Sequence, residues 1–154
     1  MKISDVKTFL VYSGGHRAGI IGAKNWIFVK VETDEGIHGW GESYSQLDRD
    51  KAIEQHVHEI KRYLVGRDPF NIKHITQMVY NDFAARRGSM DIYCALSGIE
   101  QALWDIVGKK LNVPIYNLLG GACRDKIKVY ANGWYANAST PDEYAEMAME
   151  TVKD

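Results

Sequence analysis

A long helical pattern from Ser89 to Lys110 constrains the fold of this chain more than any other feature. Apolar residues recur along it at spacings of three and four, as they do on one face of an α-helix: Ile92, Leu96, Ile99, Leu103 and Ile106. Much of the remaining surface carries small or uncharged residues, namely Cys94, Ser97, Gly98 and Gln101. We therefore predict that this segment is the buried, central helix of a helical layer. The pattern stops ahead of Pro114, and the pair Gly120 and Gly121 then permits a sharp turn.

Two segments ahead of this helix alternate apolar and polar residues at period two, over residues 2–12 and 25–33. The second is rich in aromatic and β-branched residues, which suit a pleated surface. Residues 33–36 (TDEG) form a turn that ends in glycine, and residues 37–42 (IHGWGE) follow as a third strand. The economical arrangement is a meander of three antiparallel strands. Residues 13–24 contain four glycines and are expected to form an exposed loop.

Two shorter amphipathic helices are predicted between the strands and the central helix. The first has apolar residues at helical spacing, Ile53, Val57, Ile60 and Leu64, and ends at Gly66 and Pro69. The second repeats the pattern with Ile72, Ile75, Val79 and Phe83. The expected fold class is therefore α+β, with a three-stranded antiparallel meander and a helical bundle.

Composition excludes several classes of partner. The 154 residues include 19 Lys and Arg against 20 Asp and Glu, and the charges are dispersed, so neither a nucleic acid nor an anionic membrane is expected as a partner. The first residues resemble neither a signal peptide nor a membrane span, and a cytoplasmic location is predicted. Cys94 and Cys123 are too few and too far apart for a zinc knuckle or a disulfide framework.

The pattern changes in the last part of the chain. Residues 126–132 (KIKVYAN) are predicted to form a strand, and a helix follows in which Pro141 suits the first turn. Thr140 and Glu143 match a capping box. This helix continues to the last residue without a capping signal, and the strand has no parallel neighbour in the sequence. We therefore expect residues 124–154 to open a larger parallel α/β domain.

Three stretches, taken in order, resemble one enzyme family: "VETDEGIHGWGES", "ALSGIEQALWDIVGKKLNVPIYNLLGG" and "RDKIKVYAN". The chain is similar to the N-terminal part of the mandelate racemase/muconate lactonizing enzyme group of the enolase superfamily, nearest to its acid-sugar (galactonate-type) dehydratases. The resemblance implies an enolase-like capping domain over residues 1–123. It also implies that residues 124–154 form the first β/α unit of a truncated TIM-like barrel.

The resemblance implies a chemistry for the intact parent. In such enzymes Mg²⁺ stabilises an enediolate, which forms when a base removes the proton beside a carboxylate. The lysine motif and the acidic metal ligands of the family belong to barrel strands beyond this sequence. We therefore expect no catalytic residue, no metal ligand and no activity in this chain alone. The parent is expected to act on a small sugar acid as a homo-oligomer.

Substrate-binding positions also follow from the resemblance. Two capping-domain loops close over the substrate in this family, and they match the segments that carry Arg17 and Tyr44. A guanidinium group suits bidentate contact with a carboxylate, and residues at the C-terminal end of the first barrel strand lie on the face where barrel active sites are built. The candidates are His16, Arg17, Tyr44, Arg86, Asn132 and Trp134. For each of them a solvated loop or a packing role is the alternative, and Glu42 is expected to make structural hydrogen bonds.

Other polar groups are interpreted as structural. His56 and His58 are two residues apart on a helix, so they point in different directions and cannot share a metal. Asp105 precedes Lys109 by four residues, which predicts an ion pair on a helix face.

Two functional hypotheses remain open. In the first, the chain is the N-terminal portion of a magnesium-dependent sugar-acid dehydratase, or of a racemase or cycloisomerase of the same family. In the second, it is a stand-alone, noncatalytic capping domain that binds a protein partner. Translation of the genomic DNA beyond Asp154 distinguishes them, since the first requires a lysine motif and then acidic strand ends.

Overall fold

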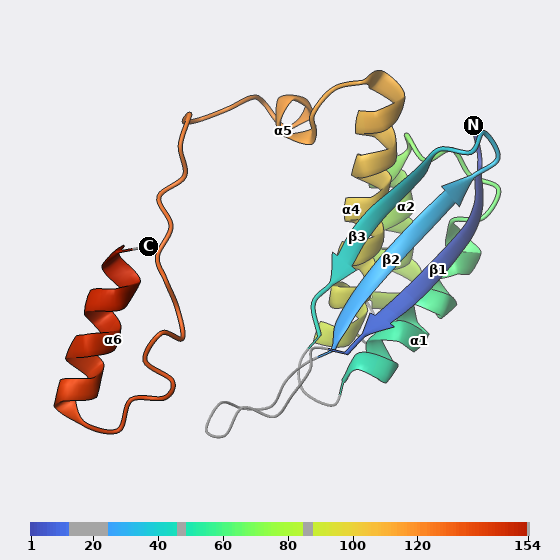
Figure 1. Ribbon diagram of the computed structural model, residues 1–154. Helices are drawn as coiled ribbons and strands as arrows, with labels where there is room; N and C mark the ends of the chain where they lie inside the picture. Colours follow the sequence, from blue (N-terminus) through green and yellow to red (C-terminus); the bar gives the residue numbers. More distant parts are fainter. Residues whose placement is uncertain (13–24, 46–48, 85–87, 154) are drawn as a thin grey trace.

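The structure is a computed structural model that describes residues 1–12, 25–45, 49–84 and 88–153. Its three strands are β1 (Ile3–Val11), β2 (Trp26–Thr33) and β3 (His38–Ser43), which form one antiparallel sheet in the order β1, β2, β3. A tight turn joins β2 to β3, in which Gly36 has a φ of 81°, a conformation that glycine adopts readily. The predicted meander is confirmed (Figure 1).

The helices are α1 (Asp50–Ile60), which a 3₁₀ turn η1 (Lys61–Tyr63) extends, α2 (Ile72–Val79), which a π-helical turn η2 (Tyr80–Ala84) extends, α4 (Met90–Leu111), α5 (Ile115–Leu118) and α6 (Pro141–Lys153). Helices α1, α2, α4 and α6 follow the predicted order, and the short helix α5 was not predicted. Asn112 ends α4 in the left-handed conformation, with a φ of 53°, and Val113 N–H donates to the Gly108 carbonyl at 2.9 Å. This closure turns the chain out of the helix before Pro114.

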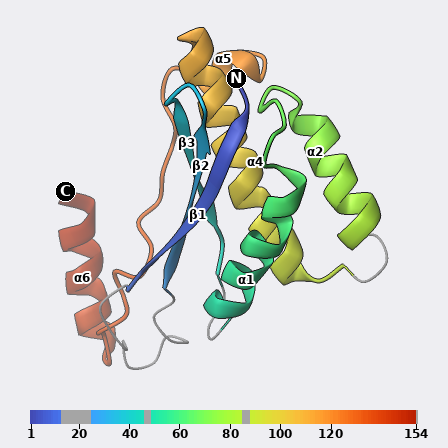
Figure 2. The ribbon, with the colours of Figure 1, turned by 90° about the vertical axis from the view of Figure 1, so that its right-hand side faces the viewer.

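Helices α1, α2 and α4 lie on one face of the sheet, and α4 is the helix in closest contact with it (Figure 2). The core between these layers is built from the apolar positions that the periodicity predicted. Its fully buried side chains include Ile27, Val29 and Val31 of β2, Val57 and Ile60 of α1, Ile75 and Val79 of α2, and Ile99, Leu103 and Ile106 of α4. Each such side chain contributes roughly 1.5–3 kcal/mol by leaving water. Partly buried Trp104 packs against this core.

β3 and α4 approach so closely that their backbones nearly touch. A methyl group added to Gly41 would lie 2.0 Å from the Gly98 carbonyl oxygen, and one added to Gly39 would lie 1.9 Å from the Ala102 carbonyl oxygen. The facing position of the helix is equally restricted, because a methyl group on Gly98 would lie 2.2 Å from Ser43 Oγ. Glycine is therefore required here for lack of space.

The opposite face of the sheet carries an exposed aromatic group. The rings of Phe9 and Trp40 lie 5.3 Å apart, those of Trp26 and Phe28 are stacked at 6.3 Å, and Lys30 Nζ lies 5.8 Å from the Trp40 ring. Phe9, Trp26 and Trp40 are 43%, 40% and 41% exposed, and Figure 1 shows α6 to the side of the sheet, past the β3 edge. This face is therefore open to solvent in the described structure.

The strand predicted over residues 126–132 is not present in the structure. The chain is irregular there, and the side chains of Ile127, Val129 and Tyr130 are about four-fifths exposed, at 79%, 82% and 84%. The physical reason is that a β-strand needs a neighbour to accept its hydrogen bonds, and none of the described strands lies alongside this segment. Its apolar alternation is consequently left in water.

The capping box at the start of α6 is confirmed. Glu143 N–H donates to Thr140 Oγ1 at 3.3 Å, and the Glu143 carboxylate accepts from the Thr140 N–H at 2.9 Å and from the Ser139 N–H at 2.6 Å. These donated bonds lower the pKa of Glu143. Local chemistry alone therefore begins this helix, since none of its residues is buried.

One ion-pair network gives a prediction for acid stability. The Glu35 carboxylate bonds to Lys110 Nζ at 2.6 Å and to the Met1 amino group at 2.9 Å. These two cations, Lys110 first, lower the pKa of Glu35 from 4.5 to about 2. A carboxylate with a lowered pKa stabilises the folded state fully above its unfolded pKa, and this contribution is lost as the pH falls through the folded pKa.

Glu35→Gln is therefore expected to lower the free energy of unfolding at pH 7, and the deficit is expected to shrink below about pH 4 and to vanish near pH 2. Urea denaturation at a series of pH values measures this difference. Glu59→Gln is the control, because the ion pair that it removes joins Glu59 to Arg62, three residues along the chain. A deficit for Glu35→Gln that stays constant from pH 7 to pH 2 contradicts the prediction.

Candidate functional site

The candidate site is the end of the sheet where β1 ends, β2 begins and β3 ends. Val11 pairs with Trp26, and Ile27 pairs with Ser43, so these three strand termini lie side by side. Figure 1 places the start of α1 at the same end. The two segments predicted to bind substrate follow β1 and β3 at this end of the sheet. We call the residues that join the strand termini to the helix starts here, Asn25, Ser45, Arg49, Asp50 and Asp91, the platform.

Side-chain hydrogen bonds join the strand termini to the helix starts. Ser45 is buried, and its hydroxyl donates to the Asn25 carbonyl at 2.8 Å. Asn25 Nδ2 donates to Asp50 Oδ2 at 2.5 Å, and this bond is the main cause of a lowered pKa for Asp50. Arg49 forms an ion pair with Asp91, which ties the start of α1 to the start of α4. The platform is therefore held together by contacts between residues far apart in the sequence.

Tyr44 extends from this platform directly after β3. Ser43 is buried against α4, so the alternation along the strand directs Tyr44 to the opposite face of the sheet. Continuing the Ile27–Ser43 pairing by one residue brings Trp26 opposite Tyr44, and the Tyr44 and Trp26 side chains are 53% and 40% exposed. An exposed tyrosine offers an apolar surface with a hydroxyl at its rim. The role of Tyr44 as a substrate wall stays a prediction.

The structure places the other candidates as follows. His16, Arg17 and Arg86 lie outside the described residues. Asn132 and Trp134 lie together in the segment between α5 and α6, where Tyr135 connects them. Its hydroxyl lies 3.2 Å from Asn132 Oδ1, and its ring meets that of Trp134 edge to face at 5.4 Å. Figure 1 shows this segment apart from the sheet that carries Tyr44.

The described carboxylates do not fit a magnesium site. Glu35 pairs with two cations, Asp50 accepts from Asn25, and Asp34 accepts the Lys2 N–H at 2.7 Å. Across the described part of the chain, no three His, Cys, Asp or Glu side chains converge in a way that would hold a metal ion. Magnesium requires several converging oxygen ligands, so we assign no step of the chemistry through this ion to these residues.

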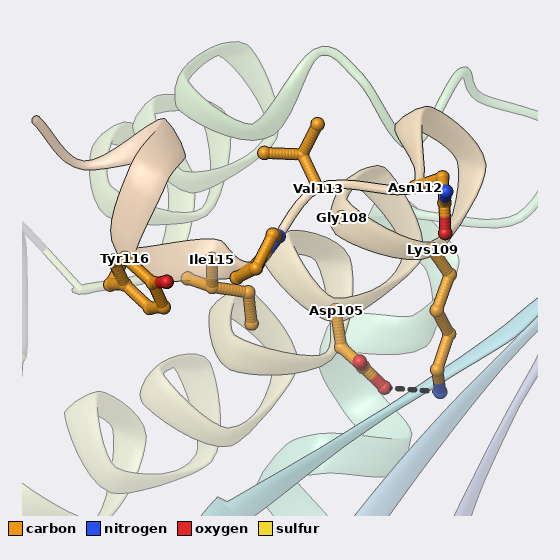
Figure 3. Close-up of a pocket in the computed structure, with 8 residues that line it drawn as sticks. Asp105, Gly108, Lys109, Asn112, Val113, Ile115 and Tyr116 are labelled. Carbon is orange, nitrogen blue, oxygen red and sulfur yellow. Dashed lines mark hydrogen bonds and ion pairs between the residues drawn. The ribbon is translucent and has the colours of Figure 1, made fainter. Parts of the chain in front are cut away.

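A hollow of about 500 Å³ lies at the C-terminal end of α4 (Figure 3). Its lining residues are Asp105, Gly108, Lys109, Asn112, Val113, Pro114, Ile115 and Tyr116. The charges within it neutralise each other, because Lys109 Nζ lies 2.6 Å from Asp105 Oδ2, as the sequence predicted. The same carboxylate accepts the Trp40 N–H at 2.9 Å. These groups serve the contact between α4 and β3, and we assign no ligand to the hollow.

The hydrogen bonds expected of Glu42 are made by its main chain. Its N–H donates to Gln101 Oε1, and its carbonyl accepts from Gln101 Nε2, both at 3.1 Å. Glu42 was an expected hydrogen-bonding residue, whereas Gln101 was expected only on the less apolar surface of the helix. The available signal was a polar residue at position 101, four residues before Asp105 and eight before Lys109, on a helix that is otherwise mostly apolar.

Within the described ranges, no helix has the length and apolar character needed to cross a membrane. The two cysteines are free, with Cys94 partly buried and Cys123 exposed.

Comparison with known proteins gives consistent matches. The family model described as the N-terminal domain of mandelate racemase and muconate lactonizing enzyme matches residues 17–120. D-galactonate dehydratase of Pectobacterium atrosepticum is 51% identical over 106 residues, which cover 69% of this chain and 27% of that protein. The chain therefore spans about a quarter of the length of that relative.

Two solved structures extend the likeness. A Mesorhizobium loti protein superposes with a TM-score of 0.87 at 38% identity, over 99% of this chain and 39% of its own. The 3,6-anhydro-D-galactonate cycloisomerase of Zobellia galactanivorans superposes with a TM-score of 0.73 at 28% identity, over 84% of this chain and 35% of its own. The first of these superpositions takes in almost the whole chain.

Proposed function

The chain belongs to the mandelate racemase/muconate lactonizing enzyme family, and from this membership we propose that it is the N-terminal portion of an enzyme that removes water from a sugar acid. The observation that carries the proposal is the 51% identity with D-galactonate dehydratase over 106 residues. In the proposed reaction a base removes the proton from C2, beside the carboxylate, and the hydroxyl on C3 takes up a proton and leaves as water. Tautomerisation of the resulting enol then gives a 2-keto-3-deoxy acid.

The proposal assigns two parts to the chain. Residues 1–123 form the capping domain, and residues 124–154 form the first β/α unit of a barrel. The exposed apolar alternation over residues 126–132 supports this assignment, because it has the pattern of a strand whose neighbours belong to another part of the enzyme. Mg²⁺ and the proton-transferring groups belong to that other part, since the described carboxylates do not converge.

Within the intact enzyme, we assign the six candidate residues to substrate binding. Arg17 provides a guanidinium group for the carboxylate, His16 and Arg86 provide further polar contacts, and Tyr44 forms a wall. Asn132 and Trp134 bind from the barrel side. The support for Tyr44 is its exposure at the platform, and the support for Asn132 and Trp134 is their joint position with Tyr135.

The test is turnover by the longer protein that contains these residues, with Mg²⁺ present, on five-carbon and six-carbon aldonic and aldaric acids. Mass spectrometry is expected to show a product lighter than its substrate by one water molecule. A product of unchanged mass and altered configuration or ring closure would instead identify a racemase or cycloisomerase, and the Zobellia cycloisomerase is one of the similar structures.

The 154-residue chain alone is expected to give no product under the same conditions. Dehydration by this chain in the absence of the longer protein would contradict the assignment of proton transfer to the barrel. Absence of turnover by the longer protein on every acid, together with tight binding of a protein partner by the isolated chain, would favour the noncatalytic alternative.

A further inference from the structure

β3 is an edge strand, yet four of its outward-facing backbone groups are bonded to side chains. β2 lies on one side of β3, and the pairs Val31 with Gly39 and Val29 with Gly41 are part of that ladder. An edge strand normally presents unpaired N–H and C=O groups that another chain can pair with. Here the His38 carbonyl, the Trp40 N–H, and the N–H and carbonyl of Glu42 bond to side chains from α4.

Three α4 side chains make these bonds in succession. Gln101 accepts the Glu42 N–H and donates to the Glu42 carbonyl, both at 3.1 Å. Asp105 Oδ2 accepts the Trp40 N–H at 2.9 Å, and Lys109 Nζ donates to the His38 carbonyl at 2.9 Å. One member of this ladder is therefore present for every second residue of the strand.

Helix and strand geometry explain the regular spacing. Four residues along an α-helix advance by about 6 Å, and two residues along a β-strand advance by about 6.6 Å. Positions 101, 105 and 109 of the helix therefore stay in step with positions 42, 40 and 38 of the strand, which runs in the opposite direction. The glycines at 39 and 41 allow the strand to approach the helix closely, so that even the short Asp105 side chain reaches its backbone.

We propose that Gln101, Asp105 and Lys109 form a substitute fourth strand that seals the β3 edge against strand addition by another chain, including a second copy of this one. The same ladder holds the end of β3 from which Tyr44 and Ser45 extend. The Asp105–Lys109 ion pair orients both of its members toward the strand. The inference concerns this chain as it stands and does not depend on the proposed catalytic function.

Amide hydrogen exchange, measured by NMR on the 154-residue chain, tests each member of the ladder separately. Gln101→Ala is expected to increase the exchange rate of the Glu42 amide by about tenfold while the Trp40 amide stays protected. Asp105→Ala is expected to give the reverse pattern. A general loss of stability would instead accelerate the exchange of both amides together, so the two patterns separate a local bond from global unfolding.

Two neighbouring helix residues provide matched controls. Glu100 pairs with Lys73 and Lys110 pairs with Glu35, so Glu100→Ala and Lys110→Ala remove ion pairs from α4 without touching the β3 backbone. If the Glu42 amide in Gln101→Ala and the Trp40 amide in Asp105→Ala exchange no faster than they do in these controls, the proposed ladder is overturned. Gln101→Glu is a variant of similar size, which can still accept the Glu42 N–H and is expected to keep that amide protected.

Whether the ladder prevents strand addition at the β3 edge is tested by measuring self-association of the chain. Light scattering is expected to show a mass that rises with concentration more steeply for the Gln101→Ala/Asp105→Ala double variant than for Glu100→Ala/Lys110→Ala. The exposed aromatic face is common to both proteins, so it does not account for a difference between them. Faster amide exchange without any additional association in the double variant would overturn the sealing of the edge.

Discussion

Gly41→Ala is expected to lower the free energy of unfolding by about 3 kcal/mol, the upper range for an overpacked core position. The added methyl group would lie 2.0 Å from the Gly98 carbonyl oxygen and 2.9 Å from Gln101 Cβ. The α4 backbone has little room to retreat, because Ile99 and Leu103 are fully buried, and a shift of β3 would disturb its pairing with β2. Urea denaturation of the 154-residue chain at pH 7 measures the change.

The control is Gly66→Ala, at a position where nothing lies within 4 Å of the added methyl group and φ is 83°. Gly66→Ala is expected to lower the free energy of unfolding by about 1 kcal/mol, because alanine is less favourable than glycine in the left-handed conformation. If Gly41→Ala lowers the free energy of unfolding no more than Gly66→Ala does, the close contact between β3 and α4 does not require glycine at position 41.

Gly98→Ala tests the same contact from the helix side, and there the competing effects have opposite signs. Helix propensity favours alanine over glycine by about 1 kcal/mol, whereas the contact with Ser43 Oγ at 2.2 Å opposes it. We expect the contact to dominate and the variant to be destabilised. Ser43 Oγ is buried and has no hydrogen-bond partner among the described residues, so Ser43→Ala is expected to cost little and to recover part of the loss in the double variant.

Arg17→Ala in the longer enzyme is expected to raise KM for the sugar acid by about 10- to 100-fold, the effect of losing a hydrogen bond to a charged group. A contact made equally in the ground state and the transition state affects KM, while kcat falls only modestly. A group that transfers the proton would instead lower kcat by orders of magnitude. Steady-state kinetics on the acid panel distinguishes these two roles.

Arg17→Lys is the matched variant. It keeps the positive charge but loses the planar fork that binds a carboxylate through two bonds, so an intermediate KM is expected. The assignment of Arg17 to substrate binding is abandoned if Arg17→Ala keeps the wild-type KM on every acid that the enzyme converts.

The sequence by itself determined most of the elements and much of the core. Alternation in residues 25–33 predicted β2, and the stripe from Ile92 to Ile106 predicted α4 as the central helix. These predictions succeeded because burial of one face imposes a period that neighbouring residues reveal. The capping box of Thr140 and Glu143 succeeded for a similar reason, since both partners lie within one turn.

Tertiary structure decided the features that depend on distant residues. Residues 126–132 alternate like a strand but form none, because backbone hydrogen bonds across a sheet require a neighbour that local sequence cannot provide. The ladder from Gln101 to Lys109 became recognisable only with β3 placed against α4, across about 60 residues of chain. The platform of Asn25, Ser45 and Asp50 depends on the same kind of contact. Periodicity reports which face of an element is buried, whereas the partner of each polar group depends on which elements the fold brings together.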